Sequence, residues 1–200
     1  YKTGVVINPL ICRYYPTTNS MDGTKFTVQN LKNKTMTTET VTDKMHSYVV
    51  QYDMHTDFFF SVLDGISDDD THNRLGTKAN HIAWLTGSLI EQRYELANML
   101  GVEGRQAAFE MFKDNKGIQD GAQYPSLADY KKDWERISPR LRNALVNADD
   151  AKLDETFEMM PGMKMSHYEF ISFVIYREAN CIGQIALWRR LLGYEAMKYM

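Results

Sequence analysis

The sequence predicts an all-α protein, a four-helix bundle with an irregular N-terminal arm. Apolar residues recur at helical spacing in four long stretches, residues 41–66, 78–100, 126–145 and 166–192. Helix-start or helix-end residues flank these stretches, among them Gly101, Ser126 and Ser166. We find no convincing strand pattern after residue 36. Long amphipathic helices with short or medium connections are typical of a four-helix bundle.

The first two stretches predict helices with one apolar face each. Spacings of three, four and seven define the first face, and the acidic run after Gly65 ends that helix. Its apolar positions are Met45, Val49, Tyr52, Phe59, Phe60 and Leu63. The second helix stops at Gly101, a residue that readily adopts the left-handed conformation of a helix end. Its apolar positions are Ile82, Leu85, Leu89, Leu96 and Met99.

The segment 101–126 predicts a long loop with one or two helical turns, and two further helices follow it. Ser126 caps the third helix, and Asp129 lies beside its positive end. Its apolar positions are Leu127, Tyr130, Trp134, Ile137, Leu141 and Leu145. Residues 149–157 extend or follow this helix. Ser166 caps the last helix, whose predicted inner face contains two polar residues and a thiol. That face is Phe170, Phe173, Val174, Arg177, Cys181, Gln184, Trp188 and Leu191.

Composition excludes several classes of protein. The 200 residues carry 26 acidic and 23 basic side chains, a formal charge of −3 without a block of like charge, so we expect no nucleic-acid partner. The two cysteines, Cys12 and Cys181, form neither a disulfide framework nor a CxxC pair, which favours a reduced, cytoplasmic setting. No apolar run approaches the length of a membrane span, so we expect no membrane partner.

Residues 1–35 differ from residues 36–200 in composition. They hold five basic residues and one acidic residue, whereas the remainder holds 18 basic and 25 acidic residues. Such a break is typical of a tail or linker. Two interpretations stay open for residues 1–35: an appended or upstream-translated leader before Met36, or a native arm that forms an edge strand or lies over the bundle. Residues 36–200 form the predicted bundle domain.

Two motifs resemble the DinB/YfiT-like family. Residues 177–193, REANCIGQIALWRRLLG, are similar to that family's last helix, H-E-A-x-H-x-G-Q followed by a leucine- and arginine-rich turn and a glycine. Residues 80–89, NHIAWLTGSL, are similar to its N-H-I-x-W-L-x-G-H-L motif. The resemblance covers about residues 40 to 195. It implies a four-helix bundle, a homodimer, and a divalent metal held by three histidines that activates a thiol or water.

The three positions that correspond to the metal-binding histidines are Ser88, Arg177 and Cys181. Serine is a poor metal ligand, and arginine has no lone pair and keeps its positive charge. We therefore expect no metal and no cofactor in this site. The surrounding residues of the motif are retained, so the resemblance implies a residual ligand pocket formed by Ser88, Arg177 and Cys181 with Trp84 and Gln184.

Other residues offer little replacement chemistry. The histidines within each helix are too far apart for one coordination sphere, and we interpret them as surface or satisfied structural residues. Cys181 has two interpretations: a nucleophile whose pKa Arg177 lowers, or a small buried hydrophobic residue, which we favour. Arg177 either pairs with a carboxylate or replaces the lost cation and holds an anionic ligand.

The sequence leaves two alternative functions open, one of a binding protein and one of an enzyme. The first is a non-catalytic bundle protein that binds a small molecule in the residual cavity, with an anion as one option. The second is a thiol transferase or hydrolase of the family type that uses a displaced or cysteine-based site. We favour the first, because all three metal-ligand positions are substituted. A plain dimerisation module is a third interpretation, and no residue in the sequence identifies its interface.

Overall fold

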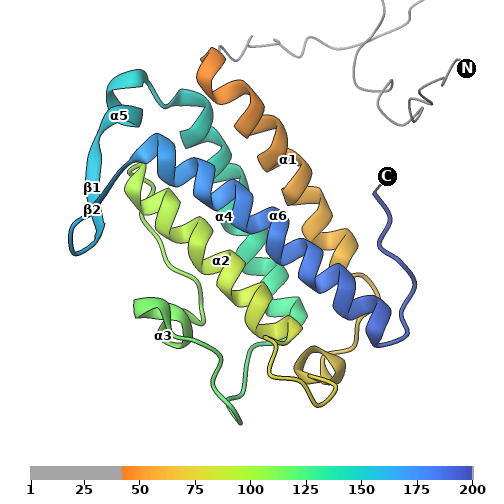
Figure 1. The fold of residues 1–200 in the computed structure, drawn as a ribbon. Coiled ribbons are helices and arrows are strands. Elements are labelled where there is room, and N and C mark those ends of the chain that lie inside the picture. Colours follow the sequence, from red (N-terminus) through yellow and green to blue (C-terminus); the bar gives the residue numbers. More distant parts are fainter. Residues whose placement is uncertain (1–41, 200) are drawn as a thin grey trace, which may run out of the picture. The chain divides into compact units, whose positions relative to one another are not determined.

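Four long helices make up most of residues 42–199, the part of the chain that the computed structural model describes (Figure 1). Their bounds are α1 (Asp43–Leu63), α2 (Ile82–Met99), α4 (Leu127–Asn147) and α6 (His167–Leu191). Each coincides with a predicted stretch to within a few residues at its ends. The predicted arm, residues 1–35, lies outside the described residues.

Short elements connect the long helices. They are η2 (Asp69–His72), α3 (Phe109–Phe112), η3 (Lys113–Asn115), α5 (Asp150–Asp154), β1 (Thr156–Met160) and β2 (Met163–Ser166). The one or two helical turns expected between residues 101 and 126 are α3 and η3. The fold is therefore mostly helical with a small two-stranded sheet.

The hairpin of β1 and β2 corrects the prediction that no strand follows residue 36. The strands pair antiparallel, with Thr156 opposite Ser166 and Met160 opposite Met163. Methionine is not among the β-branched and aromatic residues that mark strands, so residues 156–166 carried no clear strand pattern. Pro161 and Gly162 form the turn of this hairpin.

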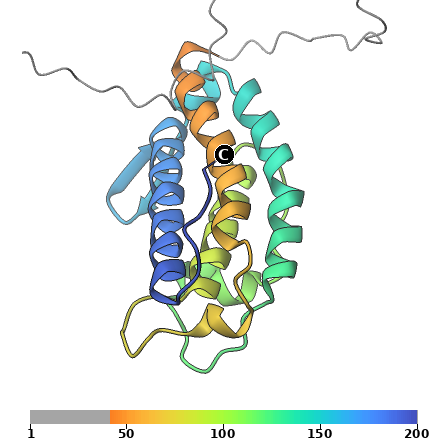
Figure 2. The same ribbon diagram turned by 90° about the vertical axis from the view of Figure 1, so that its right-hand side faces the viewer.

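Each long helix packs against two others around a shared core (Figure 2). Helix α1 contacts α4 and α6, and α2 contacts the same two helices. Near one end of α2, the indole N–H of Trp188 donates to the Asn80 carbonyl at 2.9 Å, whereas further along α2 Arg93 bonds Glu178. Helices α2 and α6 are therefore antiparallel, so that early residues of α2 lie beside late residues of α6.

Capping explains where two of the helices begin. The Ser126 hydroxyl accepts a hydrogen bond from the Asp129 backbone N–H at 3.2 Å, as the sequence predicted. At the start of α6, the Ser166 hydroxyl accepts from the Glu169 N–H at 3.2 Å, and the Glu169 carboxylate accepts from the Ser166 N–H at 2.7 Å. This reciprocal pair is a capping box, which fixes the point at which β2 gives way to α6.

An ion pair that helical periodicity does not predict lies in the core. Arg93 in α2 and Glu178 in α6 are both fully buried. Arg93 Nε donates to Glu178 Oε1 at 2.5 Å, and a terminal nitrogen donates to Oε2 at 3.0 Å. Burial alone would raise the pKa of Glu178, but the Arg93 charge and the hydrogen bonds from His55 and Arg93 outweigh it, so this pKa lies below its usual range.

The other two long helices complete the surroundings of the Arg93 guanidinium. Thr56 in α1 and Ser138 in α4 accept hydrogen bonds from Arg93 at 2.9 and 2.7 Å. The guanidinium carbon lies 3.9 Å from the ring centre of Tyr52 and 3.5 Å from that of Trp134, so two aromatic faces enclose the charge. Arg93 thus contacts residues of all three other long helices.

Candidate functional site

A cavity of about 440 Å³ lies beside α2 and α6. The connection after α2 and the hairpin provide its remaining walls. Its lining comprises Trp84, Ser88, Glu91, Gln92, Glu95, Met99, Phe112, Asn115, Lys116, Phe157, Glu158, Met159, Phe170, Phe173 and Arg177. Seven of these residues are aromatic or methionine, and the other eight are polar or charged. Apolar walls could bury the body of a small molecule, and the polar groups could orient it.

Arg177 provides the central polar group of this cavity. One terminal nitrogen donates to Gln92 Oε1 at 2.7 Å and to the Ser88 carbonyl at 3.4 Å, and the other donates to the Ser88 hydroxyl at 2.6 Å. These acceptors are all neutral. Among the described residues, no carboxylate oxygen lies within 4.0 Å of the Arg177 guanidinium, so the charge is fixed in position without a contacting counter-ion.

The acidic residues of the cavity are held by other partners or lie near its opening. Glu91 is buried and accepts a hydrogen bond from the Gln106 amide at 2.6 Å. Burial raises the pKa of Glu91, although the Gln106 hydrogen bond lowers it in part. Glu95 is exposed, and the desolvation that raises its pKa is opposed by the Arg177 charge. Glu158 in β1 accepts from the Gly162 N–H at 2.8 Å.

Gly87 allows the wall formed by α3 to approach α2 closely. A Cβ atom at this position would overlap the ring of Phe112 and the hydroxyl of Tyr130. The Gln106 amide also donates to the Gly87 carbonyl at 3.1 Å, which ties the connection to α2. Gly87 belongs to the motif at residues 80–89, so the glycine in that motif has a packing role here.

The structure brings together only part of the predicted pocket. Ser88 and Arg177 are in contact, and with Trp84 they line the cavity. Cys181 and Gln184 are not among the lining residues. Gln184 is exposed and donates to the Asn180 side chain at 2.6 Å, because it lies on the outer side of α6.

Cys181 is buried and has the properties of a core residue. It is 4% exposed, and burial raises the pKa of its thiol although Arg177 acts in the opposite direction. The interpretation as a nucleophile required a lowered pKa and an accessible sulfur. The burial and the pKa direction both favour the interpretation as a small buried hydrophobic residue.

Several cavity residues were not predicted as site residues. Gln92 lies four residues after Ser88, and this helical spacing could have placed it on the same face. Phe112, Lys116 and Met159 come from the connection and the hairpin, whose positions relative to α2 depend on tertiary contacts. No signal within their own segments could have assigned them.

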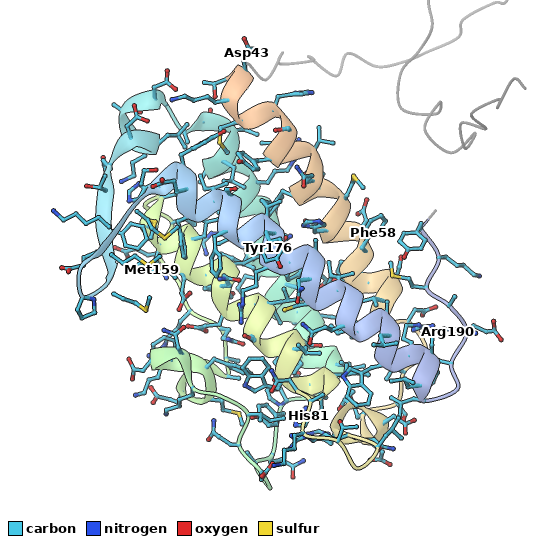
Figure 3. All side chains as sticks on the ribbon, in the orientation of Figure 1. Asp43, Phe58, His81, Met159, Tyr176 and Arg190 are labelled. Atoms are coloured by element: carbon cyan, nitrogen blue, oxygen red, sulfur yellow. The ribbon has the colours of Figure 1, made fainter. Side chains whose placement is uncertain are left out.

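His81 fixes the start of α2 and hence the position of Trp84. Its Nδ1 accepts a hydrogen bond from the Trp84 backbone N–H at 3.1 Å, so the imidazole acts as the N-cap (Figure 3). The ring is buried and lies 5.1 Å from the ring of His72 and 5.0 Å from that of Tyr124. Burial, with the nearby His72, lowers the pKa of His81 to about 4. His81 is therefore a satisfied structural histidine.

Comparisons of the sequence with protein-family models and with curated proteins find no match. The resemblance to the DinB/YfiT-like family therefore stays a prediction. Within residues 42–199, no group of three or more histidine, cysteine, aspartate or glutamate side chains is arranged to hold a metal ion. No helix in the same part of the chain is both long and apolar enough to cross a bilayer.

The His81 cap predicts a dependence of stability on pH. Between pH 6.5 and 4, the unfolded chain binds a proton at this histidine that the folded protein does not, so the free energy of unfolding falls as the pH falls. We expect His81 to account for a loss of about 2 kcal/mol between pH 7 and pH 5. In His81→Asn, which keeps a capping side chain but cannot titrate, that part of the loss should disappear from urea unfolding curves.

His46→Asn is the matched control, because His46 is exposed on α1. It should retain the pH dependence of the unmodified protein. An unchanged dependence in His81→Asn would contradict the role of the His81 imidazole.

Proposed function

We propose that this chain is a DinB/YfiT-like four-helix bundle without the three-histidine metal site, whose cavity binds a small molecule bearing an anionic group. Two observations support the resemblance. Four long helices make up most of the described residues, in keeping with the bundle that the resemblance implies. Ser88 and Arg177, at two of the three positions that correspond to metal ligands in that family, are in contact at the cavity. The binding is non-catalytic.

The observation that carries this proposal is that the Arg177 guanidinium contacts no carboxylate among the described residues. Gln92 and Ser88 hold the guanidinium in one orientation through neutral acceptors. A carboxylate, sulfonate or phosphate group entering the cavity would contact the guanidinium directly, which no carboxylate of the described residues does, through charge-assisted hydrogen bonds about twice as strong as neutral ones. If the resemblance holds, Arg177 stands at a metal-ligand position, and its guanidinium would attract an anion where the family's metal attracts a thiolate.

The other lining residues indicate the polarity of the part of the ligand that does not contact Arg177. The rings of Phe112, Phe157, Phe170 and Phe173 and the indole of Trp84 offer an apolar, largely aromatic surface. The Trp84 indole N–H is buried without a hydrogen-bond partner among the described residues, so a donor remains beside the cavity. Glu91 and Glu95 would repel an anion elsewhere in the cavity. The favoured ligand is therefore an aromatic or otherwise apolar molecule whose anionic end contacts Arg177.

The alternative, a thiol transferase or hydrolase with a cysteine-based site, has less support. Its nucleophile would be Cys181, which is 4% exposed and whose pKa is raised by burial. A thiol in this state is mostly protonated near neutral pH and is shielded from a substrate in the cavity. The free thiol remains compatible with a reduced, cytoplasmic setting.

The proposal predicts that Arg177 discriminates between charged and neutral aromatic probes. 8-Anilinonaphthalene-1-sulfonate should bind the cavity, and Arg177→Gln should weaken this binding about 10- to 100-fold, the value of a lost charge-assisted hydrogen bond. N-phenyl-1-naphthylamine has no sulfonate and should bind both proteins equally. Fluorescence titration measures both affinities.

Arg190→Gln is the control for the change of charge, because Arg190 lies on the same helix about 20 Å further along its axis (Figure 3). It should leave both affinities unchanged. Equal binding of the sulfonate to Arg177→Gln and to the unmodified protein would contradict the proposal.

We also propose the homodimer that the resemblance implies, with the outer face of α6 as its interface. Tyr176, Leu187 and Leu191 are each more than half exposed on this helix. Gly183 lies between them, and nothing is within 4 Å of where its Cβ would be. A glycine inside a helix lowers stability. No contact within residues 42–199 requires a glycine at position 183, whereas the close approach of a second copy would.

Leu187→Glu should therefore lower the dimer fraction, because it places a charge in the apolar interface. Light scattering coupled to size-exclusion chromatography measures the mass. Leu75→Glu, at an exposed leucine outside the helices, should leave the dimer intact. A monomeric unmodified protein, or equal effects of the two substitutions, would contradict this interface.

A further inference from the structure

Methionines are concentrated in the hairpin of β1 and β2. Four of the twelve methionines of the chain lie within residues 159–165: Met159, Met160, Met163 and Met165. Met160 is 56% exposed and Met163 is 42% exposed. Figure 3 shows Met159 on this hairpin. Large apolar side chains at a hairpin tip contribute little to the core, so their accumulation calls for another explanation.

The strand register places three of these side chains on one face of the hairpin. The register shifts between Glu158 and Met160, and beyond this irregularity Met160 lies directly opposite Met163, so both side chains are on the same face. Met165 follows Met163 by two residues on the same strand, and this spacing returns to the same face. The Cβ atoms of the opposed pair are about 5 Å apart, and those of the two β2 residues are about 7 Å apart. Each flexible side chain can bring its sulfur toward a common point.

The backbone that carries these side chains is held at both ends. At the tip, Gly162 has a φ of +81°, and its N–H donates to the Glu158 carboxylate at 2.8 Å. At the base, the His167 N–H donates to the Glu155 carbonyl at 2.9 Å, and the capping box follows β2. Met160 and Met163 are exposed and Met165 is half-buried, and the hairpin positions the backbone of all three.

We propose that the thioethers of Met160, Met163 and Met165 form a site for a soft monovalent cation, Cu(I) or its analogue Ag(I). Thioether sulfur is a soft, uncharged ligand that selects Cu(I) over harder divalent cations such as Mg²⁺ or Mn²⁺. Three sulfurs on one face of a fixed hairpin provide a trigonal donor set with no carboxylate or imidazole required. This site is separate from the contacts of Arg177 and does not depend on the function proposed for the cavity.

Silver binding to methionine-labelled protein tests this site. The full chain is prepared with ¹³C-methyl methionine and with Cys12→Ala and Cys181→Ala, since thiols would compete for the metal. Silver nitrate is added in a chloride-free buffer. We expect the methyl signals of Met160, Met163 and Met165 to shift together and to saturate at one equivalent. Their assignment comes from single Met→Leu substitutions, which retain apolar volume.

The double substitution Met160→Leu with Met163→Leu should weaken silver binding at least 10-fold. Met54→Leu is the matched control, because Met54 is an exposed methionine without methionine neighbours on α1, and it should change nothing. If the cysteine-free protein does not fold, the same methyl signals are followed in the unmodified chain after its thiols have bound silver. Hairpin signals that do not move, or that move no more readily than that of Met54, would overturn the proposal.

Discussion

The buried ion pair between Arg93 and Glu178 is the interaction on which the rest of the structure depends. Two charges in a core are costly unless they are paired and fully hydrogen-bonded, and removing one partner leaves an uncompensated buried charge. Here the two oxygens of Glu178 receive Arg93, and His55 Nδ1 lies 3.2 Å from one of them. The remaining Arg93 contacts reach α1 and α4. Alternative packings of the four helices would separate these partners, so the pair selects one arrangement.

This arrangement also positions the polar contact at the candidate site, because two of the cavity residues, Gln92 and Arg177, are the sequence neighbours of the ion pair. Gln92 precedes Arg93, and Arg177 precedes Glu178. Once Arg93 and Glu178 meet in the core, the adjacent residues of the two antiparallel helices meet at the cavity, where the Arg177 guanidinium donates to Gln92 at 2.7 Å. The pair Arg93–Glu178 thus lies in the core, and the adjacent pair Gln92–Arg177 lies at the cavity. The orientation of the Arg177 charge follows from the rotation of α2 and α6 that the core pair sets.

Helical periodicity was sufficient to predict the four long helices, since each has a contiguous apolar face. The inner face of α6 was predicted only in part: Phe170, Val174, Cys181 and Trp188 are buried as expected. The predicted face included Gln184, which is exposed, and omitted Glu178, which is fully buried. A carboxylate is expected at the surface unless its partner is known, and that partner lies 85 residues away in sequence. The hairpin was missed for a different reason, because its methionines have no strand periodicity distinct from that of a helix. Ser88 and Arg177 were predicted correctly as neighbours, whereas the residues from the connection and the hairpin depend on tertiary contacts.

The most direct test of this account is the coupling between Arg93 and Glu178 in the free energy of unfolding. Urea unfolding of Arg93→Met, Glu178→Leu and the double variant gives this coupling. We expect each single substitution to cost about 3–5 kcal/mol, because it leaves a buried charge unpaired, and the double variant to cost clearly less than the sum. Losses below about 1 kcal/mol for the single variants, or losses that simply add, would contradict the claim that this pair determines the packing of the four helices.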